Sequence, residues 1–76
     1  MIKINQNYIN RFKCSTCEWL YYVSPGCFLA FDKDTFEFIG IELFYLPANY
    51  DLISKKCDDK IQYLLGKDIL IYENDW

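Results

Sequence analysis

Residues 18–46 read EWLYYVSPGCFLAFDKDTFEFIGIELFYL, and their pattern specifies the central sheet of the protein. Three runs rich in aromatic and β-branched residues, a composition typical of strands, occupy residues 18–23, 27–31 and 36–46. Two turn signals separate these runs, SPG at residues 24–26 and DKDT at residues 32–35. Three strands joined by short turns predict an antiparallel β-meander.

The spacing of apolar residues changes after this stretch and predicts a helix over residues 50–65. One helical stripe holds five of its residues: Ile53, Cys57, Ile61, Leu64 and Leu65. Asn49 or Asp51 can cap the start of this helix, and Gly66 suits the left-handed residue that often ends one. The stripe is therefore expected to pack on one face of the meander.

The two ends of the chain complete the predicted architecture. Residues 2–4 and residues 68–72 have strand character, whereas residues 5–16 are polar and only weakly periodic. A chain of 76 residues has room for one domain, residues 1–76. The predicted fold class is α+β: a small, mostly antiparallel sheet, made of the meander and the C-terminal strand, with one helix packed on one face.

Both faces of the predicted sheet are apolar, although only one helix is available to cover them. Pairing Phe31 with Phe36 assigns one side to Phe28, Ala30, Ile39, Ile41, Leu43 and Tyr45, and this side is the expected seat of the helix. The same pairing assigns the other side to Leu20, Tyr22, Cys27, Leu29, Phe38, Gly40, Glu42, Phe44 and Leu46. This second side is left for residues 5–17, for a second copy in a homodimer, or for a different protein. Its aromatic composition is typical of a protein interface.

The composition excludes several classes of active site. The chain has no histidine, which excludes His-based triads, His proton shuttles and Cys₂His₂ zinc sites. It has three glycines and no Gly-rich loop, which excludes Walker-type and dinucleotide-binding cradles. A 20% aromatic content excludes a disordered tail. No serine has a base beside it, so we expect a protein that is not an enzyme and needs no cofactor.

The negative charge is concentrated in the middle of the chain. The net charge is −3, and residues 18–51 alone carry −5. This distribution disfavours direct nucleic-acid binding, which depends on Lys and Arg, and it favours a larger basic protein as the partner. A solvated acidic surface kept for solubility is the alternative. The expected partner-binding residues are Glu18, Tyr22, Asp32, Asp34, Glu37, Phe38, Glu42 and Phe44.

No sequence signal directs the chain to a membrane. Four polar residues (Asn5, Gln6, Asn7 and Asn10) interrupt any apolar segment near the start, so no signal peptide is expected. The longest uncharged run, residues 19–31, contains Pro25-Gly26 and is too short to span a bilayer. We therefore expect a cytoplasmic protein that does not bind membranes.

The four cysteines allow two interpretations. Cys14 and Cys17 form a CxxC motif, which is half of a typical zinc site, and Cys27 with Cys57 would have to supply the other half. This gives the alternative function, a small structural zinc-binding module. The favoured interpretation makes Cys27 and Cys57 small buried residues, because free cysteine is among the most buried residue types. Without a signal peptide, reduced thiols are expected rather than disulfides.

Short segments of the chain resemble known proteins. The segments FDKD (residues 31–34) and IGIEL (residues 39–43) resemble the hairpin of a widespread small bacterial domain of unknown function, which implies a meander. The final YENDW (residues 72–76) resembles the C-terminus of the immunity proteins of ribosome-cleaving colicins. Those immunity proteins are short, acidic, aromatic-rich sheets that bind a basic nuclease domain through acidic side chains.

In size and character the chain is also similar to phage-encoded anti-defence proteins, including anti-CRISPRs. These resemblances and the acidic, aromatic sheet together suggest an inhibitor that occupies a basic surface of a nuclease or another nucleic-acid-binding effector. Toxin immunity and phage anti-defence both remain open as its role.

Overall fold

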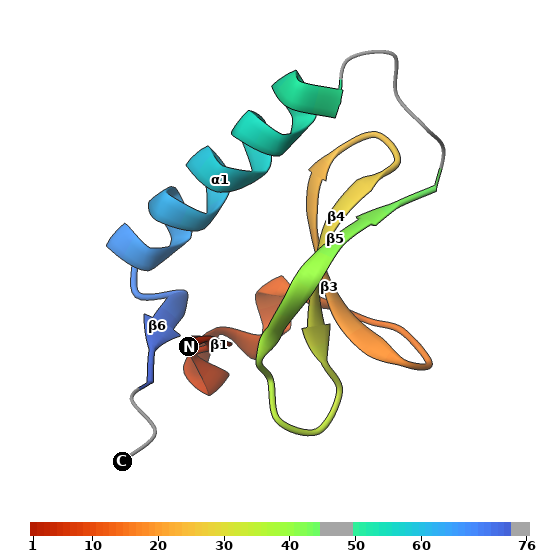
Figure 1. The fold of residues 1–76 in the computed structure, drawn as a ribbon. Helices are drawn as coiled ribbons and strands as arrows, with labels where there is room; N and C mark the ends of the chain where they lie inside the picture. Colours follow the sequence, from red (N-terminus) through yellow and green to blue (C-terminus); the bar gives the residue numbers. More distant parts are fainter. Residues whose placement is uncertain (45–49, 74–76) are drawn as a thin grey trace.

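The structure is a computed structural model that describes residues 1–44 and 50–73. It contains a 3₁₀ helix and an α-helix among short strands (Figure 1). In chain order the elements are β1 (Ile2–Ile4), η1 (Gln6–Arg11), β2 (Lys13–Cys14), β3 (Glu18–Ser24), β4 (Cys27–Asp32), β5 (Phe38–Leu43), α1 (Tyr50–Gly66) and β6 (Leu70–Tyr72). The predicted α+β class, the three central strands and the position of the helix are confirmed.

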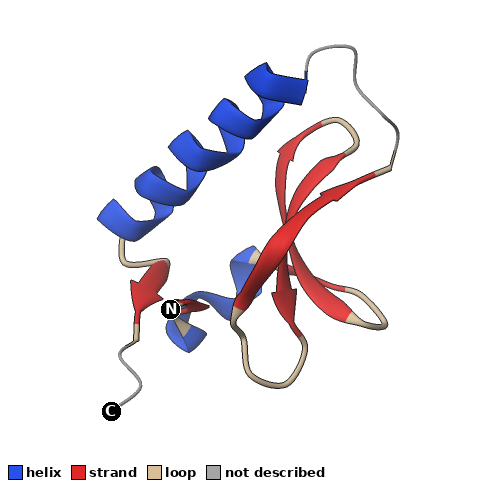
Figure 2. Ribbon diagram, in the orientation of Figure 1, coloured by secondary structure: helices blue, strands red, loops and turns tan. Residues whose placement is uncertain are grey.

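The strands form two antiparallel sheets in place of the single sheet that was expected. The meander extends to four strands in the order β2-β3-β4-β5, while β1 and β6 pair only with each other. A single bridge, Lys3 to Glu37, connects the two sheets within the described residues. The chain reaches β6 directly after α1, whose last turn accepts backbone hydrogen bonds from Lys67 and Ile69. The end of α1 therefore positions β6 beside β1 (Figures 1 and 2).

The register between β4 and β5 differs from the expected one and corrects the assignment of residues to faces. Phe31 lies opposite Phe38, not Phe36, because the connecting turn is longer than expected and Phe36 has a positive φ of 67°. A register shift then follows between Ala30 and Phe31, with Gly40 opposite Ala30 at a φ of 153°. An extra residue in one strand reverses which side chains share a face beyond it.

The face that α1 covers is consequently a mixture of the two predicted faces. Cys27 and Leu29 lie opposite Leu43 and Ile41, so these four side chains share one side of the sheet. The predicted helix seat is correct for Ile41 and Leu43 but wrong for Phe28 and Ala30, which face away from the helix. Ile39 is also wrongly placed there, since 58% of its surface is exposed.

The helix packs through its predicted stripe. Cys57, Ile61 and Leu64 are buried, and Ile53 and Leu65 pack against the same cluster. On the sheet side, this core is centred on the residues that point from β4 toward the helix, namely Cys27, Leu29 and Phe31. We call this side of the four-stranded sheet the core face. Asn49, one of the two expected caps of the helix, lies outside the described residues.

Residues before β2 also pack on the core face. Asn5 caps η1 by accepting a hydrogen bond from the Asn7 amide at 3.1 Å. This short helix leads to the buried Phe12, whose ring centroid lies 5.3 Å from those of Tyr21 and Phe31. The alternative in which residues 5–17 fold over the second face of the sheet is therefore wrong.

The described residues contain no helix with both the length and the apolar character needed to cross a membrane.

Candidate protein-binding face

We call the second side of the four-stranded sheet the outer face. It carries a compact set of side chains. Alternation along β3, β4 and β5, continued to Phe44, places nine residues on it: Glu18, Leu20, Tyr22, Phe28, Ala30, Asp32, Gly40, Glu42 and Phe44. The helices and the β1–β6 pair lie on the opposite side of the sheet (Figure 2). Within the described part of the chain, no helix or strand packs over this face.

An aromatic row crosses the outer face from β3 to the end of β5. The ring of Tyr22 meets that of Phe28 edge-on with their centroids 5.8 Å apart, and Phe28 meets Phe44 at 5.3 Å. These distances lie within the range in which aromatic pairs attract each other. The outer members are nevertheless open to solvent, with 56% of Tyr22 and 64% of Phe44 exposed. The row is thus held in position by its own contacts while much of its apolar surface remains in water.

Two carboxyl groups lie beside this row and influence each other. Partial burial, the charge of Glu42 and a side-chain hydrogen bond to Glu42 raise the pKa of Glu18 above its ordinary value. The strand positions between them carry Leu20, Ala30 and Gly40, of which the last two offer almost no side chain. Because Ala30 and Gly40 are small, the two glutamates have room to approach each other from β3 and β5.

The chemistry of the outer face suits a cationic protein surface. Two carboxylates that repel each other are stabilised when an ammonium or guanidinium group lies between them, because charge-assisted hydrogen bonds to carboxylates are the strong ones. The exposed aromatic rings add apolar contact and can also receive a cation on their faces. Lys13, opposite Leu20 on β2, lies at the border of the face and offsets only one of its acidic charges.

The structure brings five of the eight predicted partner-binding residues onto this face: Glu18, Tyr22, Asp32, Glu42 and Phe44. Asp32 lies next to Glu18 at the end of β4, but its carboxylate mainly holds the following turn. It accepts hydrogen bonds from the backbone N–H groups of Asp34 and Thr35, both at 2.8 Å. These bonds, the one from Thr35 first, lower the pKa of Asp32 below its ordinary value. Asp34 itself is exposed on the turn.

Two predicted residues lie elsewhere. Phe38 packs against the core, its ring centroid 5.5 Å from that of Phe31, because the two residues are paired directly across β4 and β5. Glu37 lies before β5, where its backbone forms the bridge to Lys3 and its carbonyl accepts from the Asp32 amide at 2.8 Å. Assigning Phe38 to the partner-binding face is thus wrong.

Phe28 is the member of the aromatic row that is absent from the predicted partner-binding residues. The predicted register assigns Phe28 to the helix side, together with Ile41 and Leu43. A signal was available within β4 alone. Cys27 and Leu29 flank Phe28, so placing these neighbours in the core, as the burial expected for Cys27 required, would have turned Phe28 outward.

The cysteines form two separate pairs. The Sγ atoms of Cys27 and Cys57 lie 3.5 Å apart in the core, and burial, followed by the hydrogen bond between them, raises the pKa of Cys57 to about 12. The interpretation of these two as small buried residues is confirmed. Cys14 and Cys17 are exposed at the β2–β3 turn. The four thiols do not converge, and residues 1–44 and 50–73 contain no group of three or more Cys, Asp or Glu arranged to hold a metal ion.

No protein-family model, curated protein or solved structure matches this chain. The resemblances of FDKD, IGIEL and YENDW to known proteins therefore gain no support from these comparisons.

Proposed function

We propose that this protein is a non-enzymatic binding protein whose outer face covers a basic surface of a larger protein. One observation supports this proposal. The same side of the sheet carries both the exposed aromatic row, Tyr22-Phe28-Phe44, and the neighbouring carboxyl groups of Glu18 and Glu42. Aromatic residues are the usual anchors of protein interfaces, and charged residues around them set the register and the rate of encounter.

The size of the molecule is compatible with such an interface. A protein–protein contact of ordinary size takes about 800 Å² from each partner. The whole chain exposes 5264 Å². One side of a four-stranded sheet can supply the required area without involving the helix.

The charge of the face indicates which kind of protein it would inhibit. Basic surfaces on nucleases and other nucleic-acid-handling proteins neutralise phosphates with Lys and Arg. An acidic, aromatic face that covers such a surface competes with the nucleic acid and so inhibits the larger protein. Toxin immunity and phage anti-defence are both roles of this type.

The first experiment locates the binding face with two matched double variants. The tagged parent protein, Tyr22→Ala/Phe44→Ala and Tyr63→Ala/Leu52→Ala are used to capture partners from cells that carry the gene. The two pairs have similar exposure, since Tyr63 is 55% and Leu52 is 60% exposed, but the second pair lies on α1. We expect the outer-face variant to lose the partner and the helix variant to keep it. The reverse result would move the binding site to α1, and equal capture by all three proteins would reject the outer face.

The second experiment separates the roles of charge and aromatic contact with the captured partner. Glu42→Lys should slow association, and the association rate of the parent should fall as salt increases, because exposed charges are screened beyond about 8 Å at physiological ionic strength. Phe44→Ala should mainly speed dissociation, with little dependence on salt. Association that is insensitive to both salt and Glu42→Lys would leave the acidic residues as a solubility feature.

A further inference from the structure

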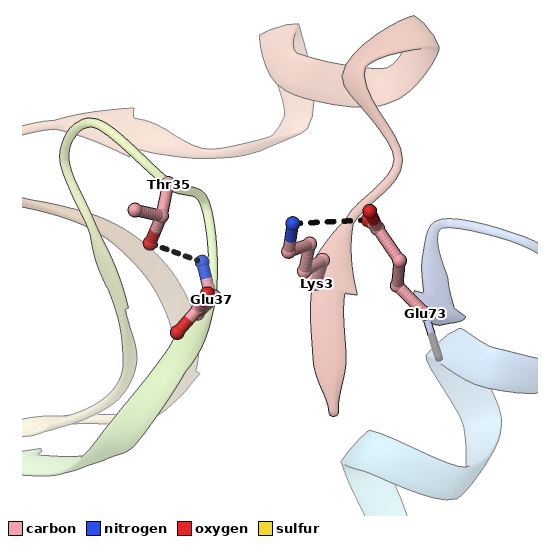
Figure 3. A network of polar contacts seen from close by, with 4 residues as sticks. All are labelled: Lys3, Thr35, Glu37 and Glu73. Atoms are coloured by element: carbon pink, nitrogen blue, oxygen red, sulfur yellow. Dashed lines mark hydrogen bonds and ion pairs between the residues drawn. The ribbon is translucent and has the colours of Figure 1, made fainter. Parts of the chain in front are cut away.

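One edge of the four-stranded sheet is only partly covered. β5 is the last strand in the order β2-β3-β4-β5, so one side of its backbone has no partner from the meander. β1 covers the segment just before β5, where the Ile4 amide donates to the Phe36 carbonyl at 3.0 Å and Lys3 bridges to Glu37. Figure 3 shows Lys3 between Glu37 and Glu73, with its ammonium 3.0 Å from the Glu73 carboxylate.

The pattern of hydrogen bonds identifies which β5 groups point away from the sheet. The Phe44 amide donates to the Gly26 carbonyl at 3.0 Å. Hydrogen-bonded and non-bonded pairs alternate along an antiparallel ladder, so Phe28 with Glu42 is a bonded pair and Leu29 with Ile41 is not. The N–H and C=O groups of Ile41 and Leu43 therefore point outward. In the described ranges, 1–44 and 50–73, no strand pairs with them.

The two sides of this open edge differ in chemistry. Toward the outer face it carries Gly40 and Glu42, and toward the core it carries the half-buried Ile41 and Leu43. The side chains of a strand laid along the edge would alternate between these two environments. Those on the outer side would lie beside Glu42, where a cation is favoured, and those on the other side would lie beside isoleucine and leucine.

We propose that the edge of β5 at Ile41 and Leu43 takes up an extended segment of the partner, with alternating basic and apolar residues, as an added strand in line with β1. Strand addition to an open sheet edge is a common mode of peptide recognition, in which backbone hydrogen bonds supply affinity and the side chains supply specificity. The inference rests on the proposed function and names the part of the partner that is recognised. A second copy of this chain is disfavoured as the occupant, because the added strand would bring another Glu42 to an already acidic face.

The test uses the full-length ¹⁵N-labelled protein and capped peptide probes. The first probe alternates lysine and valine over seven residues, the second replaces each lysine with glutamate, and the third has the composition of the first in blocks. In saturating alternating lysine peptide, the amide exchange of Ile41 and Leu43 should slow by about tenfold or more, since exchange reports local protection. The Glu42 amide already bonds to β4 and should change little. The acidic peptide and the block peptide should leave all three amides unchanged.

A backbone variant tests the same contact from the protein side. Leu43→Pro removes an outward N–H without removing a β4–β5 hydrogen bond, and edge strands tolerate proline in this orientation. Unchanged circular dichroism with loss of peptide binding would support the proposal, with Leu43→Val as the matched control. If Leu43→Pro fails to fold, amide exchange in the parent protein still tests whether the peptide binds at the β5 edge.

Three results would overturn strand addition. The peptide could change the NMR chemical shifts of Tyr22, Phe28 and Phe44 without protecting the amides of Ile41 and Leu43 from exchange. This result would leave the outer face as the binding site and reject the edge. Absence of any peptide binding would also reject the edge, while the proposed function would still be decided by the outer-face variants. Protection of Ile41 and Leu43 that rises with protein concentration alone would show that a second copy is the occupant.

Discussion

The two faces of the four-stranded sheet have similar composition and opposite surroundings. On β4, Leu29 and Phe31 point to the core face and are 0% exposed, whereas their neighbour Phe28 points to the outer face, where Phe44 is 64% exposed. The core face is covered by α1 and by Phe12, and the outer face by no described element. Apolar character alone therefore does not identify the core of this small sheet.

The carboxylates distinguish the faces better than the aromatic residues do. Glu18 and Glu42 both lie on the outer face, and no charged residue of the described chain is buried. Burying an unpaired charge is far more costly than exposing a phenylalanine. A face that is both aromatic and acidic therefore remains at the surface until a partner supplies the opposite charge.

The largest expected difference between the faces comes from the same substitution made on each. Phe31→Ala should destabilise the protein by about 3–5 kcal/mol, as removal of a buried phenylalanine does. For a domain whose total stability is about 5 kcal/mol, this loss can abolish folding at room temperature. Phe44→Ala should change the stability by less than about 1 kcal/mol. Urea unfolding followed by circular dichroism measures both. Similar midpoints for the two variants would contradict the difference in burial between the two faces, and a lower midpoint for Phe44→Ala would mean that the faces are assigned the wrong way round.

The thiols offer a second, smaller contrast. Cys57→Ser puts a hydroxyl into the core beside the thiol of Cys27, a weak hydrogen-bond partner, and should cost about 1–3 kcal/mol. Cys17→Ser makes the same chemical change at the exposed β2–β3 turn and should stay within about 0.5 kcal/mol of the parent. Thermal melts in a reducing buffer measure both. A Cys57→Ser variant as stable as the parent would show that α1 does not pack tightly at this position.

The smallest effect concerns the charge on the outer face. The pKa of Glu18 is raised above its ordinary 4.5 in the folded protein, so the folded state binds this proton more tightly than the unfolded chain does. Glu18 therefore lowers the stability as the pH rises from below 4.5 through the raised pKa. Glu18→Gln removes this penalty and should raise the melting temperature at pH 7 by about 1–3 °C, an effect of a few tenths of a kcal/mol in a domain of this size.

The pH dependence provides the control for this prediction. The gain from Glu18→Gln should disappear near pH 3.5, which is about one unit below the ordinary pKa, where the parent glutamate is protonated in both states. Asp34→Asn makes the same change in net charge on the β4–β5 turn and should show a smaller gain at pH 7. Equal gains from the two variants would indicate a general effect of net charge and no specific repulsion from Glu42.

Local patterns in the sequence predict the central strands and the helix of this protein. Aromatic and β-branched runs separated by turn residues specify the three central strands, because these preferences act over a few residues. The stripe that contains Cys57, Ile61 and Leu64 specifies the helix and its buried side for the same reason. Five members of the candidate binding face are also predictable from the pattern of charge and aromatic residues: Glu18, Tyr22, Asp32, Glu42 and Phe44.

The composition of the two faces and the pairing of β1 with β6 depend on the tertiary fold. One extra residue near Gly40 reverses the alternation, so it exchanged Phe38 for Phe28 on the outer face. The pairing of β1 with β6 joins the start of the chain to its last strand, and the open edge at Ile41 and Leu43 depends on how far β1 extends along β5. Registers and long-range pairings of this kind result from packing the whole chain, and a local pattern is not enough to fix them.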